Sequence, residues 1–228
     1  MKSLLNSFVF TLSIKEIDLS DKYGKLPEIN LTLKWDSTVY PTANPKVLQR
    51  ARQILAYNPI FIDTETTGFS PEDVVIEIGV VDLAGNTLYE SLIKPSTPIP
   101  PDSIAVHGIS DQMVENAPSW KEVWPDLIKV LSGRFVGMYN ADFDLRMLQQ
   151  TQKRYWMDWP LDKKHFFCVM KLYAAFYGQI DTRRRTFRFH KLEAAGAACG
   201  IPLPNSHRAV DDALLTAVLF KYIADYEP

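Results

Sequence analysis

The feature that most constrains the fold is a series of three strand-like segments that begins at Pro59. Ile60-Phe61-Ile62 is a short apolar run, and residues 74–83 form a longer one that is almost entirely apolar. The turn Ala84-Gly85-Asn86 separates the second run from a third, residues 87–94. Apolar runs bounded by turn residues are typical of buried strands, so these segments predict a meander of three strands.

The remainder of this region alternates between strand and helix patterns. A fourth strand is predicted over residues 134–139. Apolar residues recur at helical spacing in five further segments, which are 119–131, 141–154, 170–177, 191–199 and 209–226. Three strands followed by strand–helix alternation predict an α/β domain with a mixed sheet.

The first 50 residues are interpreted as an N-terminal extension, and residues 51–228 as the main domain. Residues 29–35 alternate between apolar and polar with period two, which predicts a half-exposed strand. Asn44-Pro45 then opens a helix with an apolar face. The extension is expected to pack onto the main domain. Three roles stay open for it, namely binding a protein partner, capping a sheet edge and mediating dimerisation.

Composition excludes several classes of protein. Hydrophobic residues make up 46% of the 228 residues and charged residues 23%, which is typical of a globular chain and not of a disordered one. The formal net charge is −2, so nucleic-acid binding would need a local basic patch. Only two cysteines are present, Cys168 and Cys199, which excludes a disulfide framework and makes a structural zinc site unexpected.

The start of the chain loosely imitates a signal peptide. Asn6 and Ser7 interrupt its apolar region, and no small-residue cleavage site precedes Lys15-Glu16. No segment approaches the roughly 18 apolar residues of a membrane-spanning helix. Together with the scarce cysteines, these features predict a cytoplasmic protein without a membrane span.

Two acids stand at the end of the first apolar strand. Asp63 and Glu65 are two residues apart, so on a strand both side chains leave the same face. Neighbouring carboxylates repel each other unless cations hold them, and oxygen-only ligands suit Mg²⁺ or Mn²⁺. The alternative is a solvated strand end with two incidental acids.

Two further groups of polar residues lie at predicted helix starts. Asp142 and Asp144 follow a strand, and on a helix they point in different directions, so one of them is free to face the first pair of acids. Both also suit the positive end of a helix without any site. His207 precedes the last helix and Asp212 lies within its first turns, whereas Asp211 is expected to point elsewhere and to be solvated.

These motifs, in this order, resemble the DEDDh family of 3′–5′ exonucleases, which includes polymerase proofreading subunits and RNase T. The resemblance covers about residues 59 to 224. The motifs that carry it are Asp63-x-Glu65, Asn140-Ala141-x-Phe143-Asp144 and His207-x4-Asp212, supported by Ile76-Glu77-Ile78-Gly79 and Val106-His107-Gly108-Ile109. The related type with a catalytic Tyr would have it at position 208, where this chain has Arg208.

The resemblance implies an RNase H-like fold with a five-stranded mixed sheet and two divalent cations. Asp63, Glu65, Asp144 and Asp212 match the metal ligands of the family, and His207 matches its general base. Asp142 and Asp211 match no ligand position. This chain departs from the proofreading members at Tyr139, where they often have His, and the departure concerns the nucleotide pocket and not the chemistry.

Substrate contacts are predicted at several positions near these motifs. The resemblance implies that His107, on a loop after the proline-rich residues 95–101, contacts the terminal nucleotide. The backbone amides of Thr64 and Thr66 are candidates for nucleotide binding. Phe143 and Phe69 are suited to flank a base, because aromatic stacking tolerates every base, although Phe143 also suits the core.

The single basic cluster is Arg183-Arg184-Arg185-Thr186-Phe187-Arg188-Phe189-His190-Lys191. Cations interleaved with aromatic residues are typical of a track for single-stranded nucleic acid, and Arg183, Arg184 and Arg185 are predicted to bind its backbone. A solvated charged loop explains the cluster equally well.

The sequence therefore predicts a 3′–5′ exonuclease that uses Mg²⁺ or Mn²⁺ and releases nucleoside 5′-monophosphates from the 3′ end of DNA, with RNA as a second candidate substrate. Its expected partner is the single-stranded 3′ end of a nucleic acid. Two alternatives stay open. One is trimming of RNA ends in the manner of an oligoribonuclease, and the other is an inactive nucleic-acid-binding module.

Overall fold

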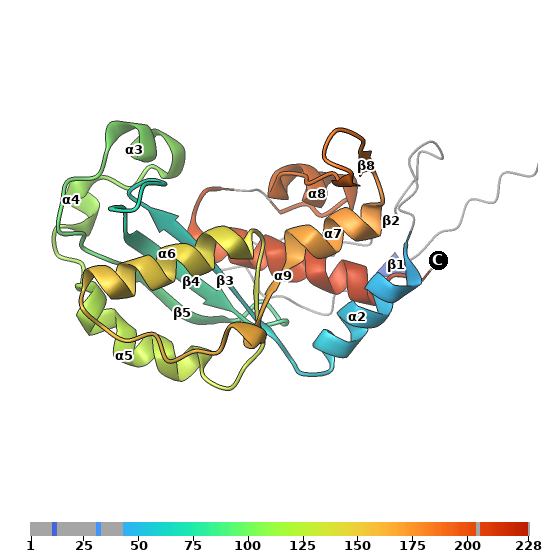
Figure 1. Cartoon of the computed structure of the whole chain (residues 1–228), viewed down its shortest axis with the longest axis horizontal. Coiled ribbons are helices and arrows are strands. Elements are labelled where there is room, and N and C mark those ends of the chain that lie inside the picture. The colour runs from blue at the N-terminus through green and yellow to red at the C-terminus, as the bar shows by residue number, and fades with distance from the viewer. Residues whose placement is uncertain (1–10, 13–30, 33–42, 204–205, 228) are drawn as a thin grey trace, which may run out of the picture. The chain divides into compact units, whose positions relative to one another are not determined.

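The computed structural model describes residues 11–12, 31–32, 43–203 and 206–227, and it divides the chain into two compact units (Figure 1). In the first unit, Met1–Pro41, the described residues form one antiparallel pair, β1 (Thr11–Leu12) with β2 (Leu31–Thr32). The rest of the strand predicted at residues 29–35 lies outside the described residues. The second unit, Thr42–Pro228, contains all of the structure discussed below.

The second unit is built around a five-stranded mixed sheet in the order β5-β4-β3-β6-β7. Its strands are β3 (Ile60–Thr66), β4 (Val75–Val81), β5 (Thr87–Leu92), β6 (Val136–Met138) and β7 (Phe166–Cys168). The first three form the predicted antiparallel meander, and β6 and β7 run parallel to β3. The RNase H-like α/β fold is thereby confirmed.

Helices cover both faces of this sheet (Figure 1). Ile60 and Ile62 of β3 point into a core shared with α5 (Trp120–Leu131) and α6 (Ala141–Arg154). Phe61 points the other way, and its ring lies 5.3 Å from that of Phe220. Phe220 belongs to the last helix, α9 (Ala209–Asp225). The alternation of β3 thus sorts its side chains between two helical layers.

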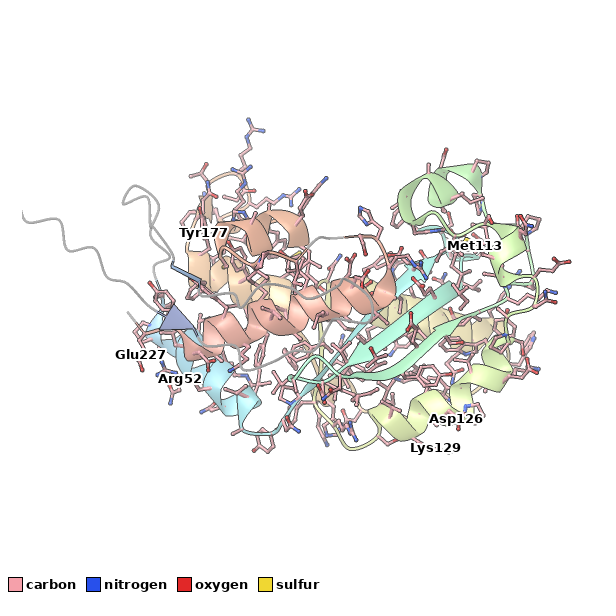
Figure 2. All side chains as sticks on the ribbon, turned by 180° about the vertical axis from the view of Figure 1, so that it is seen from behind. Arg52, Met113, Asp126, Lys129, Tyr177 and Glu227 are labelled. Carbon is pink, nitrogen blue, oxygen red and sulfur yellow. The ribbon has the colours of Figure 1, made fainter. Side chains whose placement is uncertain are left out.

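Three more helices lie beside α9. They are α2 (Pro45–Leu55), α7 (Val169–Tyr177) and α8 (Leu192–Ala198). Figure 2 shows Arg52 of α2 close to Glu227, and the Arg52 guanidinium donates to the carbonyls of Ala224 and Tyr226 at 3.0 and 2.8 Å. The predicted boundary at residue 50 therefore falls inside a helix that is bound to the end of α9.

Two local predictions differ from the structure. Residues Pro101–His107 form a short helix, α3, so Val106 and His107 are helical and not part of a loop. Proline is favoured at the first position of a helix, so this end of the proline-rich segment starts a helix instead of preventing one. The chain leaves the helix at Gly108, whose φ of 72° is in the left-handed region. A second short helix, α4 (Asp111–Val114), follows.

The basic cluster also has more structure than predicted. It lies on a hairpin of two short strands, β8 (Ile180–Asp181) and β9 (Thr186–Phe187), with the three arginines in its turn. The Asp181 carboxylate accepts from the backbone amides of Arg183 and Arg184, both at 3.0 Å. The Asp181 side chain therefore holds this turn, and the arginine side chains of the turn are exposed.

Among the described helices, none is both long and apolar enough to cross a membrane.

Candidate active site

The two acids of β3 face α9. Asp63 and Glu65 alternate with Ile62 and Thr64, as the period of a strand requires. Across the antiparallel ladder, Asp63 lies opposite Gly79 of β4, and Glu65 lies opposite Glu77. Both acids are only partly exposed, so their charges are held close to the sheet.

Asp144 joins them from the first turn of α6. Its side chain is only 3% exposed, and the Thr64 hydroxyl donates to its Oδ1 at 2.9 Å. Asp142 instead projects into solvent and pairs with Lys171 at 2.5 Å. The prediction that one of these two acids turns toward the first pair is correct, and Asp144 is that residue.

Asp212 and His207 complete the cluster from the start of α9. Single ligand-type atoms of Glu65, His207 and Asp212 all lie within 4.8 Å of one another. The Ser206 amide donates to Asp212 Oδ1 at 3.2 Å, and its hydroxyl donates to Asp211 Oδ2 at 2.7 Å. Asp211 is only 9% exposed and accepts the hydrogen bond from Ser206, so the expectation that it is solvated was wrong.

The start of α9 approaches β4 unusually closely. A Cβ atom on Gly79 would lie 2.4 Å from the backbone nitrogen of Val210, so only glycine fits at this position. Beside it, Glu77 accepts from the backbone amide of Ala209 at 2.9 Å, as a carboxylate at a helix N-terminus does. Gly79 and Glu77 thus hold the start of α9 against β4, and this places Asp212 near Asp63 and Glu65.

The electrostatics of the acidic centre, which we define as Asp63, Glu65, Asp144 and Asp212, reflect burial and mutual repulsion. Burial, followed by the charges of Asp144 and Asp212, raises the pKa of Asp63 well above its ordinary range. Burial, together with Asp212 and Glu77, raises the pKa of Glu65 to about 8.

The other two acids of this centre behave in the same way. Burial raises the pKa of Asp144 to about 7, although the hydrogen bond from Thr64 opposes the shift. Burial raises the pKa of Asp212 to about 7 against the hydrogen bond from Ser206. Three elements bring these four carboxylates together, although their burial and mutual repulsion cost free energy. Such a set of oxygen ligands fits divalent cations, because the positive charge of the cations offsets the repulsion.

The predicted nucleotide-binding residues next to this centre use their side chains within the protein. The Thr64 hydroxyl binds Asp144, and the Thr66 hydroxyl donates to the Gly68 carbonyl at 2.8 Å. His107 is buried at the end of α3, where its Nδ1 accepts from the Ile109 amide at 3.0 Å. Nucleotide contacts by these three residues stay predictions.

Two aromatic side chains lie together beside the acidic centre. The rings of Phe69 and Phe143 have centroids 5.6 Å apart, and Phe69 is 77% exposed. Arg146 lies 5.4 Å above the Phe143 ring and also donates to the Phe69 carbonyl at 3.3 Å. Phe69 is thus an exposed ring on a loop held in place from α6.

Arg183, Arg184 and Arg185 lie on the β8–β9 hairpin, which we call the basic hairpin. Figure 1 shows it beside α8, and among the described residues no hydrogen bond or ion pair joins the three arginine side chains to the acidic centre. A role for them would therefore depend on nucleic acid that extends beyond the acidic centre.

Comparison with known proteins identifies the family. The family model for exonucleases of the RNase T type matches residues 60–220. An uncharacterised exonuclease of Escherichia phage 186 is 35% identical over 187 residues, which cover 79% of this chain and 95% of the phage protein. This chain is a member of the DEDDh exonuclease family.

Further relatives of this exonuclease include much larger proteins. The PolC-type DNA polymerase III of Thermotoga maritima is 32% identical over 71% of this chain, and the 3′-5′ exonuclease DinG of Staphylococcus haemolyticus is 32% identical over 69%. The matched regions span only 11% and 17% of those two proteins.

Solved structures agree with the assignment. Exonuclease X in complex with 5′ overhanging duplex DNA is 25% identical, with a TM-score of 0.51, over 72% of this chain and 89% of that one. The nuclease domain of 3′hExo, a DEDDh family member bound to rAMP, is 20% identical and shares the fold with a TM-score of 0.60, again over 72% and 89%. This exonuclease accordingly acts on nucleic acids, and its family uses divalent metal ions, for which Glu65, His207 and Asp212 form a candidate cluster.

The pair formed by Glu77 and Arg208 was not predicted from the sequence. Glu77 stands out there only as part of a motif, and Arg208 only because the position lacks Tyr. One signal was available, since Glu77 is the single charged residue in the otherwise apolar run of residues 74–81. An acid buried in such a strand requires a partner, but only the tertiary structure identifies it as Arg208.

Proposed function

We propose that this exonuclease removes nucleotides from the 3′ end of DNA and releases nucleoside 5′-monophosphates. The observation that carries the proposal is the convergence of Asp63, Glu65, Asp144 and Asp212 with His207 at the edge of the acidic centre. DNA is favoured over RNA by the names of the relatives, which include a DNA polymerase III and a nuclease solved with duplex DNA.

The four carboxylates are suited to hold two Mg²⁺ or Mn²⁺ ions, because both cations prefer oxygen ligands. When bound, such a pair of ions stabilises the charge on the attacking and leaving oxygens of a phosphodiester. Thr64 keeps Asp144 in place through its hydroxyl, and the Ser206 amide does the same for Asp212.

His207 is the proposed general base. Its side chain is exposed and contributes a ligand-type atom within 4.8 Å of those of Glu65 and Asp212. A neutral imidazole is a good proton acceptor near pH 7, so His207 can take the proton of the attacking water. Phe69 and Phe143 supply rings for stacking against a base of a single strand.

The polarity of digestion tests this function directly. DNA labelled at its 5′ end should shorten stepwise from the 3′ end in the presence of Mg²⁺, and a 3′-phosphorylated copy should resist. A circular single strand is the matched control, because an exonuclease has no end to attack there. Cleavage of the circle at a comparable rate, or label released first from the 5′ end, would contradict the proposal.

We also place the protein in the cytoplasm, where thiols stay reduced. Both cysteines, Cys168 and Cys199, are free. Binding of a protein partner by residues 1–50 stays a prediction.

A further inference from the structure

Glu77 is a fifth carboxylate beside the acidic centre, but its contacts differ from those of the other four. Its side chain is 2% exposed, and Arg208 binds it through Nε at 2.9 Å and through Nη2 at 2.5 Å. The Ala209 amide donates to its other oxygen at 2.9 Å. The charge of Glu77 is therefore compensated within the protein, and its oxygens are directed at the start of α9.

Arg208 follows His207 directly in the chain, and His207 has an unusual backbone conformation. Its φ is 51°, in the left-handed region that residues other than glycine rarely adopt. Such a conformation persists only where the surroundings hold it.

The residues on both sides of His207 are fixed. Ser206 binds Asp212 through its amide and Asp211 through its hydroxyl. Arg208 is bound to Glu77, which belongs to a central strand and lies directly opposite Glu65 in the ladder. One of the two anchors thus lies on β4, the strand that pairs with β3, and β3 carries Asp63 and Glu65.

We propose that Glu77 and Arg208 are positioning residues that hold the turn at His207, so that its imidazole faces the acidic centre. The inference rests on the proposed role of His207 as general base. Neither Glu77 nor Arg208 needs to touch nucleic acid, because both act through the backbone between residues 206 and 209.

The planar guanidinium is part of this arrangement. Arg208 offers several donors in a fixed fork that matches a carboxylate, whereas lysine offers a point charge on a flexible stem. Arg208→Lys is therefore expected to restore only part of what Arg208→Ala loses. Glu77→Gln keeps an oxygen for the Ala209 amide but weakens the bond to Arg208, and should have an intermediate effect.

A double-mutant cycle tests the proposal. The rate of the chemical step is measured in single-turnover reactions with Mg²⁺ and excess enzyme for wild type, His207→Ala, Arg208→Ala and the double variant. Binding of the same DNA strand is measured with Ca²⁺ in place of Mg²⁺. Lys129→Ala, which breaks a surface ion pair of 2.8 Å with Asp126 on α5 (Figure 2), is the control for loss of a cation.

Arg208→Ala should slow the chemical step by about 10²-fold with unchanged DNA binding, because a misplaced base loses the reaction geometry. In the His207→Ala background the same change should cost less than about twofold, since residues that act through one another are not additive. Arg208→Lys and Glu77→Gln, which are less disruptive to folding, should each lose part of the rate in the wild-type background and none in the His207→Ala background.

Equal losses in both backgrounds would assign Arg208 a purely structural role and overturn the inference, as would a wild-type rate for Arg208→Ala. These results leave the proposed function intact as long as His207→Ala alone is slow. A wild-type rate for His207→Ala would instead refute the general base itself, and the positioning role with it.

Discussion

The acidic centre and the basic hairpin are assembled in opposite ways. The four acids come from β3, α6 and α9, and the fold buries them against their mutual repulsion. The three arginines are consecutive in the chain, exposed, and ordered only by the turn that carries them. Carboxylates that the fold brings together and buries, although this costs free energy, indicate a functional site. A run of exposed charged residues indicates only a local electrostatic potential.

From this comparison we expect that the loss of a single carboxylate from the acidic centre abolishes activity. Asp63→Asn and Asp144→Asn should each abolish DNA hydrolysis, because one less carboxylate leaves the cations incompletely held. Chelation of the wild type with EDTA should do the same, and added Mg²⁺ or Mn²⁺ should restore activity. Release of mononucleotides is the measurement, and Asp142→Asn is the matched control, since Asp142 is exposed and paired with Lys171. Full activity in EDTA would refute the metal-dependent mechanism.

The basic hairpin should contribute a smaller effect that depends on salt. Replacing Arg183, Arg184 and Arg185 with Ala should weaken binding of longer single strands and leave cleavage of a short one unchanged. Each lost phosphate contact should remove about 0.7 from the slope of log affinity against log salt.

The matched control for the hairpin replaces three exposed cations elsewhere on the surface, Lys129, Arg134 and Lys153. If both triple variants change the slope of log affinity against log salt equally, binding depends only on the overall charge of the protein. If neither variant changes this slope, the basic hairpin is a solvated turn that does not bind nucleic acid.

The smallest expected effect concerns stability without metal. Asp63→Asn removes a charge that Asp144, Asp212 and Glu65 all repel, so the melting temperature in EDTA should rise. Each kcal/mol of relieved repulsion corresponds to about 2–4 °C for a domain of this size. Excess Mg²⁺ should cancel or reverse the difference. Asp126→Asn on the surface of α5 should not shift the melting temperature in this way, and a fall for Asp63→Asn would contradict the electrostatic account.

Much of this arrangement was predictable because it depends on local patterns. The apolar runs at Ile60 and at residues 74–83 specify two central strands, and the spacing of Asp63 from Glu65 places both side chains on one face. The strand β7 (Phe166–Cys168) was not recognised individually, because three half-buried residues carry no periodicity.

Other features depend on contacts between distant segments. The partner of Glu77, Arg208, lies 131 residues away in the chain. The close approach at Gly79 likewise requires knowing that α9 crosses β4 there. The sequence identifies which residues are chemically unusual, but their partners follow only from tertiary packing.

The ladder between β3 and β4 has a consequence for folding itself. Asp63 pairs with Gly79 and Glu65 with Glu77, so a slip of one residue would exchange the faces of the strand. The acids would then be buried in the apolar layer beneath α5 and α6, and Ile62 would be turned toward Asp212. Burial of unpaired charge makes such a misfolded hairpin strongly unfavourable. The carboxylates proposed to carry the chemistry therefore also select the one strand register from which the native domain can grow.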